Sequence, residues 1–169
     1  MALPKKLKDF NLFGNGDNWQ GMIASLTLPP LARQMEEFRG GGMAAPVDID
    51  HGMQKLQFQW TPAGLIPELF DNFGTSQMDA DMLRFAGSYE RDDTGQTVPV
   101  EIVVRGRHSE INMGDAEAGS DNTQSVTTTL SYYKLTIDGE DVVEIDVPGM
   151  VEKIGGVDRL KERRSNLGL

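Results

Sequence analysis

The chain has 169 residues, 38% of them hydrophobic, and a net charge of −10, which suits one domain with a hydrophobic core. The acidic charge argues against a tight nucleic-acid binder, because such proteins carry basic patches. The absence of cysteine excludes disulfides and thiolate chemistry, and no apolar run approaches the roughly 20 residues of a membrane span. We therefore expect a soluble protein with no membrane partner.

Two short strands joined by a tight turn are predicted at the start of the chain. The Asn15-Gly16 pair, which follows Asn11–Phe13, is a strong hairpin signal. The return strand is expected over about residues 19–28, where two consecutive prolines end it.

The segment at about residues 29–52 is irregular and longer than most connections in compact domains, which usually indicates function. Leu31, Met35 and Phe38 have helical spacing, so a short helix is one interpretation and an extended arm is the other. A run of three glycines, two methionines and several acids favours a surface that lies against another protein over a catalytic one.

Residues 54–61 give the clearest strand pattern, because apolar and polar residues alternate strictly there. The apolar residues that follow have the spacing of an amphipathic α-helix over Leu65–Phe73. A proline in its first turn and a glycine after its end support this helix.

Further strands are predicted in the second half of the chain, at Met82–Glu90, Thr97–Arg107, Ser125–Ile137 and Val142–Val147. A polar loop spans roughly residues 113–124. The strand after this loop changes the phase of its apolar residues partway. A bulge near Tyr132 and Tyr133, or a strand that bridges two sheets, would explain the change.

Together these elements predict a mainly β fold, an antiparallel β-sandwich or barrel. One flanking α-helix accompanies the sheet. A short C-terminal helix is also expected within residues 155–169, with Val157 and Leu160 facing inward. There is no internal repeat, so we expect residues 1–169 to form a single domain that carries the long segment at about 29–52.

No arrangement of residues points to catalysis, a metal or a cofactor. His51 and His108 are the only histidines, too few for a metal site in a chain without cysteine, and we interpret both as surface or turn residues. The Gly14-Asn15-Gly16 turn lacks the third glycine of a dinucleotide fingerprint. An enzyme or a carbohydrate-binding β-sandwich stays an alternative that no motif supports.

Several short motifs occur in order over nearly the whole chain. They are Asn11–Phe13 with its Asn-Gly turn, Ser25–Pro29, Glu37–Met43, Ala45–Asp48, Arg84–Tyr89, Ser131–Leu135, Asp138-Gly139, Glu144–Asp146, Gly156–Leu160 and Asn166–Leu169. In this order they closely resemble the major tail tube proteins of contractile-tailed bacteriophages, a family shared with the tubes of R-type pyocins.

The resemblance implies a β-sandwich or barrel subunit that closes hexameric rings, whose inner wall is one continuous β-barrel. The rings would stack into the inner tube of a contractile tail, the conduit for DNA during ejection. The resemblance also implies that the long segment is an extended arm that packs on neighbouring subunits and on the next ring. The alternative within this architecture is the tube of a DNA-free contractile particle, pyocin-like or of a type VI secretion system.

The implied partners are further copies of the chain, the tail sheath protein, baseplate and tail terminator proteins, and, transiently in the lumen, the tape measure protein and DNA. No cofactor is implied. The implied location is the virion, after synthesis in the cytoplasm of the host bacterium.

We assign residues to three expected surfaces, namely the arm, the wall of the lumen and the surface that faces the sheath. The arm set comprises Arg33, Met35, Glu37, Phe38, Arg39, Gly40, Gly41, Gly42, Met43 and Asp48. The lumen set comprises Lys55, Gln57, Gln59, Glu101, Arg105, Thr127 and Thr129. Without the resemblance, Gln57, Gln59, Thr127 and Thr129 would favour a solvent-facing sheet. The sheath set comprises Glu68, Asp71, Asp115, Glu117 and Asp121, acids that would also keep a free subunit soluble.

Overall fold

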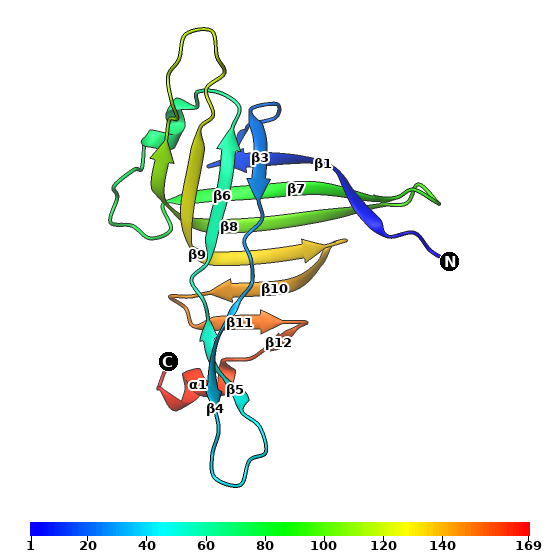
Figure 1. Ribbon diagram of the computed structural model, residues 1–169, viewed down its shortest axis with the longest axis vertical. Helices are drawn as coiled ribbons and strands as arrows, with labels where there is room; N and C mark the ends of the chain where they lie inside the picture. The colour runs from blue at the N-terminus through cyan, green and yellow to red at the C-terminus, as the bar shows by residue number, and fades with distance from the viewer.

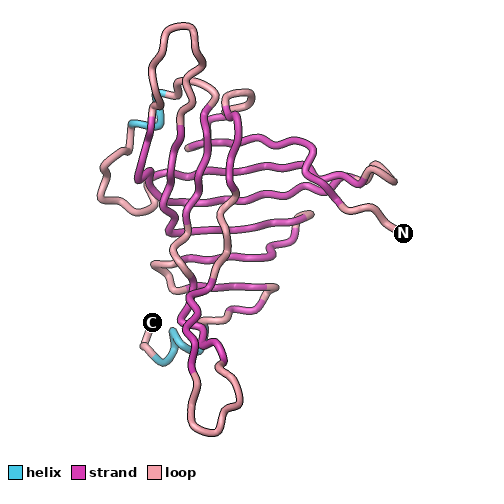
Figure 2. Tube along the Cα trace, in the orientation of Figure 1, coloured by secondary structure: helices cyan, strands magenta, loops and turns pink.

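The structure is a computed structural model that describes residues 1–169, and antiparallel strands dominate it (Figure 1 and Figure 2). The strands are β1 (Lys5–Gly14), β2 (Asp17–Asn18), β3 (Ile23–Thr27), β4 (Arg33–Phe38), β5 (Val47–Met53), β6 (Gln57–Pro62), β7 (Asp81–Arg91), β8 (Thr97–Asn112), β9 (Ser125–Ile137), β10 (Glu140–Asp146), β11 (Val151–Ile154) and β12 (Val157–Asp158). The helical segments are the 3-10 helix η1 (Pro67–Phe70) and the α-helix α1 (Lys161–Asn166). Neither has the length and apolar character that a membrane crossing requires.

The strands form two layers that cross one another (Figure 1). The back layer runs in the order β12-β11-β10-β9-β8-β7-β1-β2. The front layer consists of β3, β6, the first half of β9 and the last part of β8. β8 and β9 therefore belong to both layers, as the corner strands of orthogonally packed sheets do.

β8 and β9 pass from one layer into the other at a β-bulge. Arg105 pairs with Tyr132 but Gly106 pairs with Leu130, so Ser131 is the extra residue of β9. A bulge of this kind bends the strand and increases its twist. Both explanations for the phase change in this strand are confirmed, because the bulge is present and the strand bridges two layers.

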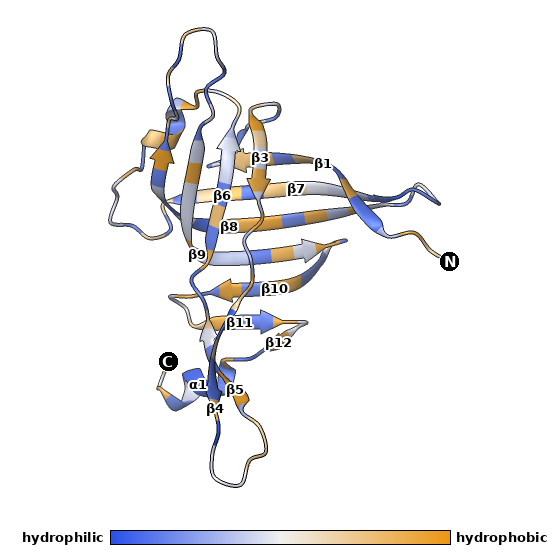
Figure 3. Cartoon of the chain, in the orientation of Figure 1, coloured by the Kyte–Doolittle hydropathy of each residue, from blue (hydrophilic) through white to orange (hydrophobic).

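The hydrophobic core lies between the two layers in one cluster of 16 buried residues. The front layer contributes Phe58 and Trp60, whose alternation with polar neighbours was predicted and is confirmed. The back layer contributes Phe85 and Ile102, and the rings of Trp19 and Trp60 stack with centroids 5.4 Å apart. Figure 3 shows hydrophobic and hydrophilic residues alternating along β7 and β8, which places one side of the back layer on the core.

His108 lies in this core, so its interpretation as a surface or turn residue is wrong. β8 continues past the predicted end at Arg107, and the inward phase of its alternation carries His108 with it. The side chain is 1% exposed, and its Nδ1 atom lies 2.9 Å from Oγ1 of Thr128. His51 is exposed in β5, as expected, with its Nε2 atom 2.9 Å from a carboxylate oxygen of Glu36.

The α-helix predicted over Leu65–Phe73 is also wrong, because only the short η1 forms there. Ile66 is extended, since the residue before a proline is disfavoured in the helical conformation. The residues that remain are too few to nucleate an α-helix. Ile66 and Leu69 are buried, whereas three apolar neighbours stay exposed, namely Leu65, Phe70 and Phe73.

The C-terminal helix is confirmed as the short α1. The residues before it form the β11–β12 hairpin at the end of the back layer. Val157 belongs to β12 and is 54% exposed, so its predicted inward position is wrong, while Leu160 is half-buried.

Candidate assembly surfaces

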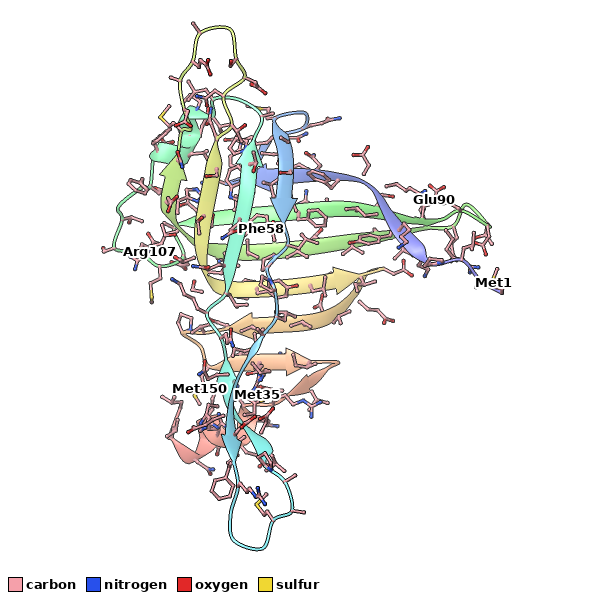
Figure 4. All side chains as sticks on the ribbon, in the orientation of Figure 1. Met1, Met35, Phe58, Glu90, Arg107 and Met150 are labelled. Carbon is pink, nitrogen blue, oxygen red and sulfur yellow. The ribbon has the colours of Figure 1, made fainter.

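β4 and β5 form a two-stranded hairpin that projects from one end of the molecule (Figure 1). Figure 4 labels Met35 on this hairpin and Met150 near its base. Neither strand pairs with a strand of the two layers. The segment with helical spacing is therefore an extended arm, as the resemblance implied.

Both faces of the arm mix apolar and acidic side chains, because Glu36 lies opposite Ile49 and Met35 lies opposite Asp50. Phe38 lies opposite Val47, and each side chain is about half exposed. Glu37 lies opposite Asp48, and like charges in direct opposition destabilise an isolated hairpin. The arm thus exposes apolar side chains to water and leaves the carboxylates of Glu37 and Asp48 without an ion pair.

Arg33 anchors the base of the arm. Its Nε donates to Oδ2 of Asp50 over 2.8 Å, and its guanidinium also pairs with Glu152, a buried residue of β11. The hydrogen bond from Arg33 is the main cause that holds the pKa of Asp50 below its ordinary value. Gln54 adds a hydrogen bond of 3.1 Å from Nε2 to the carbonyl of Arg33. These contacts orient the arm at its base only.

The turn at the tip of the arm is closed around Met43. The amide of Gly40 donates to Sδ of Met43 at 3.0 Å, and Nε of Arg39 donates to its carbonyl at 3.2 Å. The predicted arm set therefore lies together on one hairpin, as Arg33, Met35, Glu37, Phe38, Arg39, Gly40, Gly41, Gly42, Met43 and Asp48. That this set contacts other subunits stays a prediction.

The front layer turns a polar face away from the core, and its charged residues are Arg107, opposite Thr129, and Glu110, opposite Thr127. Gln57 lies opposite Thr129, and Gln59 lies opposite Thr127. A hollow of about 400 Å³ lies along this face, and Glu110 is the only charged residue in its lining. These four residues of the lumen set therefore share one surface, which we call the polar face.

Glu101 and Arg105 do not lie on the polar face with the four residues above. Both belong to the stretch of β8 within the back layer and point away from the core there. Glu101 forms an ion pair of 3.1 Å with Arg84, and Arg105 lies over the ring of Tyr132, 5.8 Å from its centroid. Lys55 is exposed, but it lies in the connection before β6 and not in the strand.

The acids of the sheath set occupy two separate places. Glu68 and Asp71 are exposed in and directly after η1, beside the edge of β8 (Figure 1). Asp115, Glu117 and Asp121 are exposed in the loop over 113–124, which extends past the front layer at the end opposite the arm. That these five acids face the sheath stays a prediction.

The front layer has two free edges. β3 pairs only with β6, so its other side is unpaired. On the opposite side, Arg107–Asn112 of β8 pairs only with β9, and Arg107 marks this edge in Figure 4. The two edge strands point in opposite directions (Figure 1), so copies placed side by side would pair them antiparallel. Unpaired edges of this kind are templates for further strands.

The residues that could carry chemistry do not converge. His51 lies on the arm and His108 lies in the core between Thr128 and Asp81. The structure contains no group of three or more His, Cys, Asp and Glu side chains that could hold a metal ion.

The fold is that of tube components from contractile injection systems. The sheath/tube terminator of the PVC extracellular contractile injection system matches with a TM-score of 0.60, covering 79% of this chain and 96% of that chain at 11% identity. The sheath-tube complex of the same system matches with a TM-score of 0.59, covering 79% and 91% at 13% identity.

The chain belongs to the family described as phage tail tube protein FII, whose model matches residues 4–168. It is 45% identical over 172 residues to the tail tube protein of Escherichia phage P2, with 100% of both chains covered. It is 36% identical over 172 residues to the major tail tube protein of Serratia phage KSP20, covering 100% of this chain and 99% of that protein. The family resemblance seen in the short motifs is thereby confirmed.

Proposed function

We propose that this protein is the major tail tube subunit of a contractile phage tail, in which hexameric rings stack into the inner tube. The observation that carries the proposal is the front layer, which combines a polar outer face with two free edges. Family membership and the full-length similarity to two phage tail tube proteins support it. Because both relatives come from phages, we favour a phage tail over a DNA-free particle.

The ring closes when β3 of one subunit pairs with the Arg107–Asn112 edge of the next. The front layers then become one continuous barrel, and closure removes both free edges of the front layer. The polar face, with Gln57, Gln59, Thr127 and Thr129, becomes the wall of the lumen.

The charge of this wall suits the passage of DNA. No Lys or Arg lines the hollow on the polar face, where Glu110 adds negative charge. Arg107, which lies opposite Thr129, is the one cation among the strands of this face, and its guanidinium donates to the carbonyl oxygen of Thr75. Cationic contacts with phosphates dominate DNA binding, so a wall with few free cations lets DNA slide. The tape measure protein and DNA are the transient occupants of this lumen.

The outward face of the back layer then becomes the outside of the tube and the surface for the sheath. It carries exposed ion pairs, such as Arg84 with Glu101 and Lys134 with Asp141 at 3.4 Å. Exposed pairs contribute roughly 0–1 kcal/mol each, so contacts to such a surface are individually weak. The arm contacts neighbouring subunits and the next ring, and the ends of the stack meet the baseplate and the tail terminator.

The subunit is made in the cytoplasm of the host bacterium and acts in the virion as a structural protein without catalytic activity. The test is negative-stain microscopy of the purified protein, in which we expect rings or tubes with a central channel. Deleting Gly40–Ala45 from the arm should leave a folded subunit that cannot polymerise. A wild-type protein that stays monomeric under all assembly conditions would contradict the proposal.

A further inference from the structure

An apolar groove lies on the back layer beside β3, at the side where the front layer ends (Figure 1). Its volume is about 380 Å³, and Val98 and Tyr133 lie among its lining residues with Ile137 and Leu28. Lys5 is the only charged residue in the lining. The side of the back layer that elsewhere packs on the front layer is therefore uncovered here.

The opposite side of the molecule is closed by η1 and its flanks. Ile66 and Leu69 insert into the core, where they are only 1% and 2% exposed. Three neighbours point away from the core with exposures of 58%, 42% and 53%, namely Leu65, Phe70 and Phe73. We call these three residues the plug. The subunit thus has an open apolar groove on one side and an exposed apolar plug on the other.

The plug lies beside the edge of β8. The guanidinium of Arg107 donates to the carbonyl oxygen of Thr75 at 3.0 Å, which ties the chain after the plug to this edge. The groove lies beside β3, since Leu28 directly follows that strand. The groove therefore lies at the β3 edge of the front layer, and the plug lies at the β8 edge.

We propose that the plug of one subunit fills the groove of the next copy in the ring. The inference rests on the proposed function, because pairing β3 with β8 of the next copy is what brings the two sides together. The resulting interface is heterologous, with a different surface on each partner, and interfaces of this type generate closed rings when the rotation fits.

Charge complementarity supports a second copy as the occupant. Lys5 lies at the groove, and the segment that carries the plug also carries the exposed acids Glu68 and Asp71. The inference places these two acids at the subunit interface and not on a track for the sheath. The exposed apolar side chains of the arm, such as Phe38, are the rival occupant, but the arm projects from the end of the molecule and not from its side (Figure 1).

The test uses engineered cysteines, which are unique thiols because the chain has none of its own. Phe73→Cys and Ile137→Cys are combined in one chain, tubes are assembled, and a short bis-maleimide is added before a denaturing gel. We expect a ladder of crosslinked species that stops at the hexamer, because a contact within one ring closes on itself. Each single-cysteine variant is the matched control and should give no ladder.

Two results would overturn the inference. One is normal tubes of the double variant without crosslinks. The other is a ladder from Phe38→Cys with Ile137→Cys, which would place the arm in the groove. In both cases tubes still form, so the proposed function stands, whereas a wild-type protein without tubes would contradict the function itself.

A charge exchange keeps the inference testable if the cysteine variants fail to assemble. Lys5→Glu should lower the yield of tubes roughly fivefold at low salt, since exposed ion pairs contribute little and are screened. Adding Glu68→Lys to the same chain should restore the yield. Lys6→Glu is the control, because Lys6 does not line the groove. Equal losses for Lys5→Glu and Lys6→Glu, or no rescue, would count against the interface.

Discussion

The Oδ2 atom of Asp81 lies 3.7 Å from Nε2 of His108, and both side chains are almost completely buried. Oδ1 of Asp81 accepts hydrogen bonds from Asn15 and Asn72 at 3.0 and 3.1 Å, whereas Oδ2 has no hydrogen-bond partner. Burial lowers the pKa of His108, and the negative charge of Asp81 opposes this shift only in part. Burial therefore disfavours the charged form of the His108 imidazole, although a carboxylate lies beside it.

We expect the stability of the subunit to fall as the pH drops through the ordinary histidine pKa of 6.5. Because the pKa of His108 is lower in the folded state, the unfolded state binds more protons there, and the free energy of unfolding decreases. Above that pH the histidine contributes no such change. Thermal unfolding at about pH 7.5 and about pH 5.5 measures the drop, since few carboxylates titrate in that window. His108→Gln should reduce the drop and His51→Gln should not; an equal drop in both variants would contradict the expectation.

Thr128→Val should destabilise the subunit by roughly 1–3 kcal/mol, because it leaves buried polar groups without a partner. Oγ1 of Thr128 accepts from Nε1 of Trp60 at 3.3 Å and lies 2.9 Å from Nδ1 of His108. Valine keeps the shape but removes both contacts. Urea unfolding measures the loss. Thr127→Val on the polar face is the control, and a change as large there would mean that the buried contacts are not the cause.

Gly106→Ala should cost at least about 3 kcal/mol or prevent folding, because overpacking against a rigid backbone leaves no low-energy adjustment. A Cβ atom at Gly106 would lie 1.9 Å from the carbonyl oxygen of Thr129, at the bend where β8 changes layer. Gly41→Ala in the arm meets nothing within 4 Å and serves as control. Soluble yield and melting temperature report the effect, and a Gly106→Ala protein as stable as the control would refute this account of the bend.

Arg33→Met should loosen the arm without unfolding the two layers. The substitution removes the contact to Asp50 and leaves the buried Glu152 without its cation. Amide hydrogen exchange should become faster in β4 and β5 and stay unchanged in β8, because local opening depends on local contacts. Lys8→Met, which removes an exposed ion pair with Asp92, is the control. Unchanged exchange in the arm would show that its base is held by other contacts.

Gln57→Lys combined with Gln59→Lys should permit tubes but slow DNA ejection, because the new cations would bind phosphates. The slowing should weaken as salt rises, since salt screens such contacts. Gln96→Lys, in the exposed turn between β7 and β8, adds charge away from the polar face and is the control. If phage with the double variant ejected DNA at the normal rate, the polar face would not be the wall that DNA passes.

The strands were predictable from the sequence because their period-2 alternation is a local property. The bend within β8 was not. Polar and apolar residues alternate through β8 without a break, so the sequence places Glu101, Arg105 and Arg107 on one surface. In the structure the strand changes layer at Gly106, between Arg105 and Arg107. The outer sides of the two layers face opposite ways. Glu101 and Arg105, which precede the bend, therefore lie on the outer side of the back layer and not on the polar face. In the sequence, the bulge at Ser131 is visible only in β9, where the alternation of apolar residues changes phase.

The arm shows a second limit of local patterns. The spacing of Leu31, Met35 and Phe38 fitted a short helix, but the segment could equally form an extended arm. The sequence pattern alone did not distinguish these two conformations. The structure leaves all three side chains largely exposed, at 44%, 50% and 52%. Apolar spacing predicts a helix only when one face is buried by the same chain, and here the burial has to come from elsewhere.

β8 and β9 run without interruption through both layers, and this continuity has a mechanical consequence. A force applied to the back layer reaches the front layer along covalent backbone and not only across side-chain contacts. Because both strands cross between the layers at the same place, one layer cannot slide over the other without deforming the backbone of β8 and of β9 near the bulge at Ser131. The subunit should therefore transmit thrust as a stiff unit, with its two surfaces moving in step.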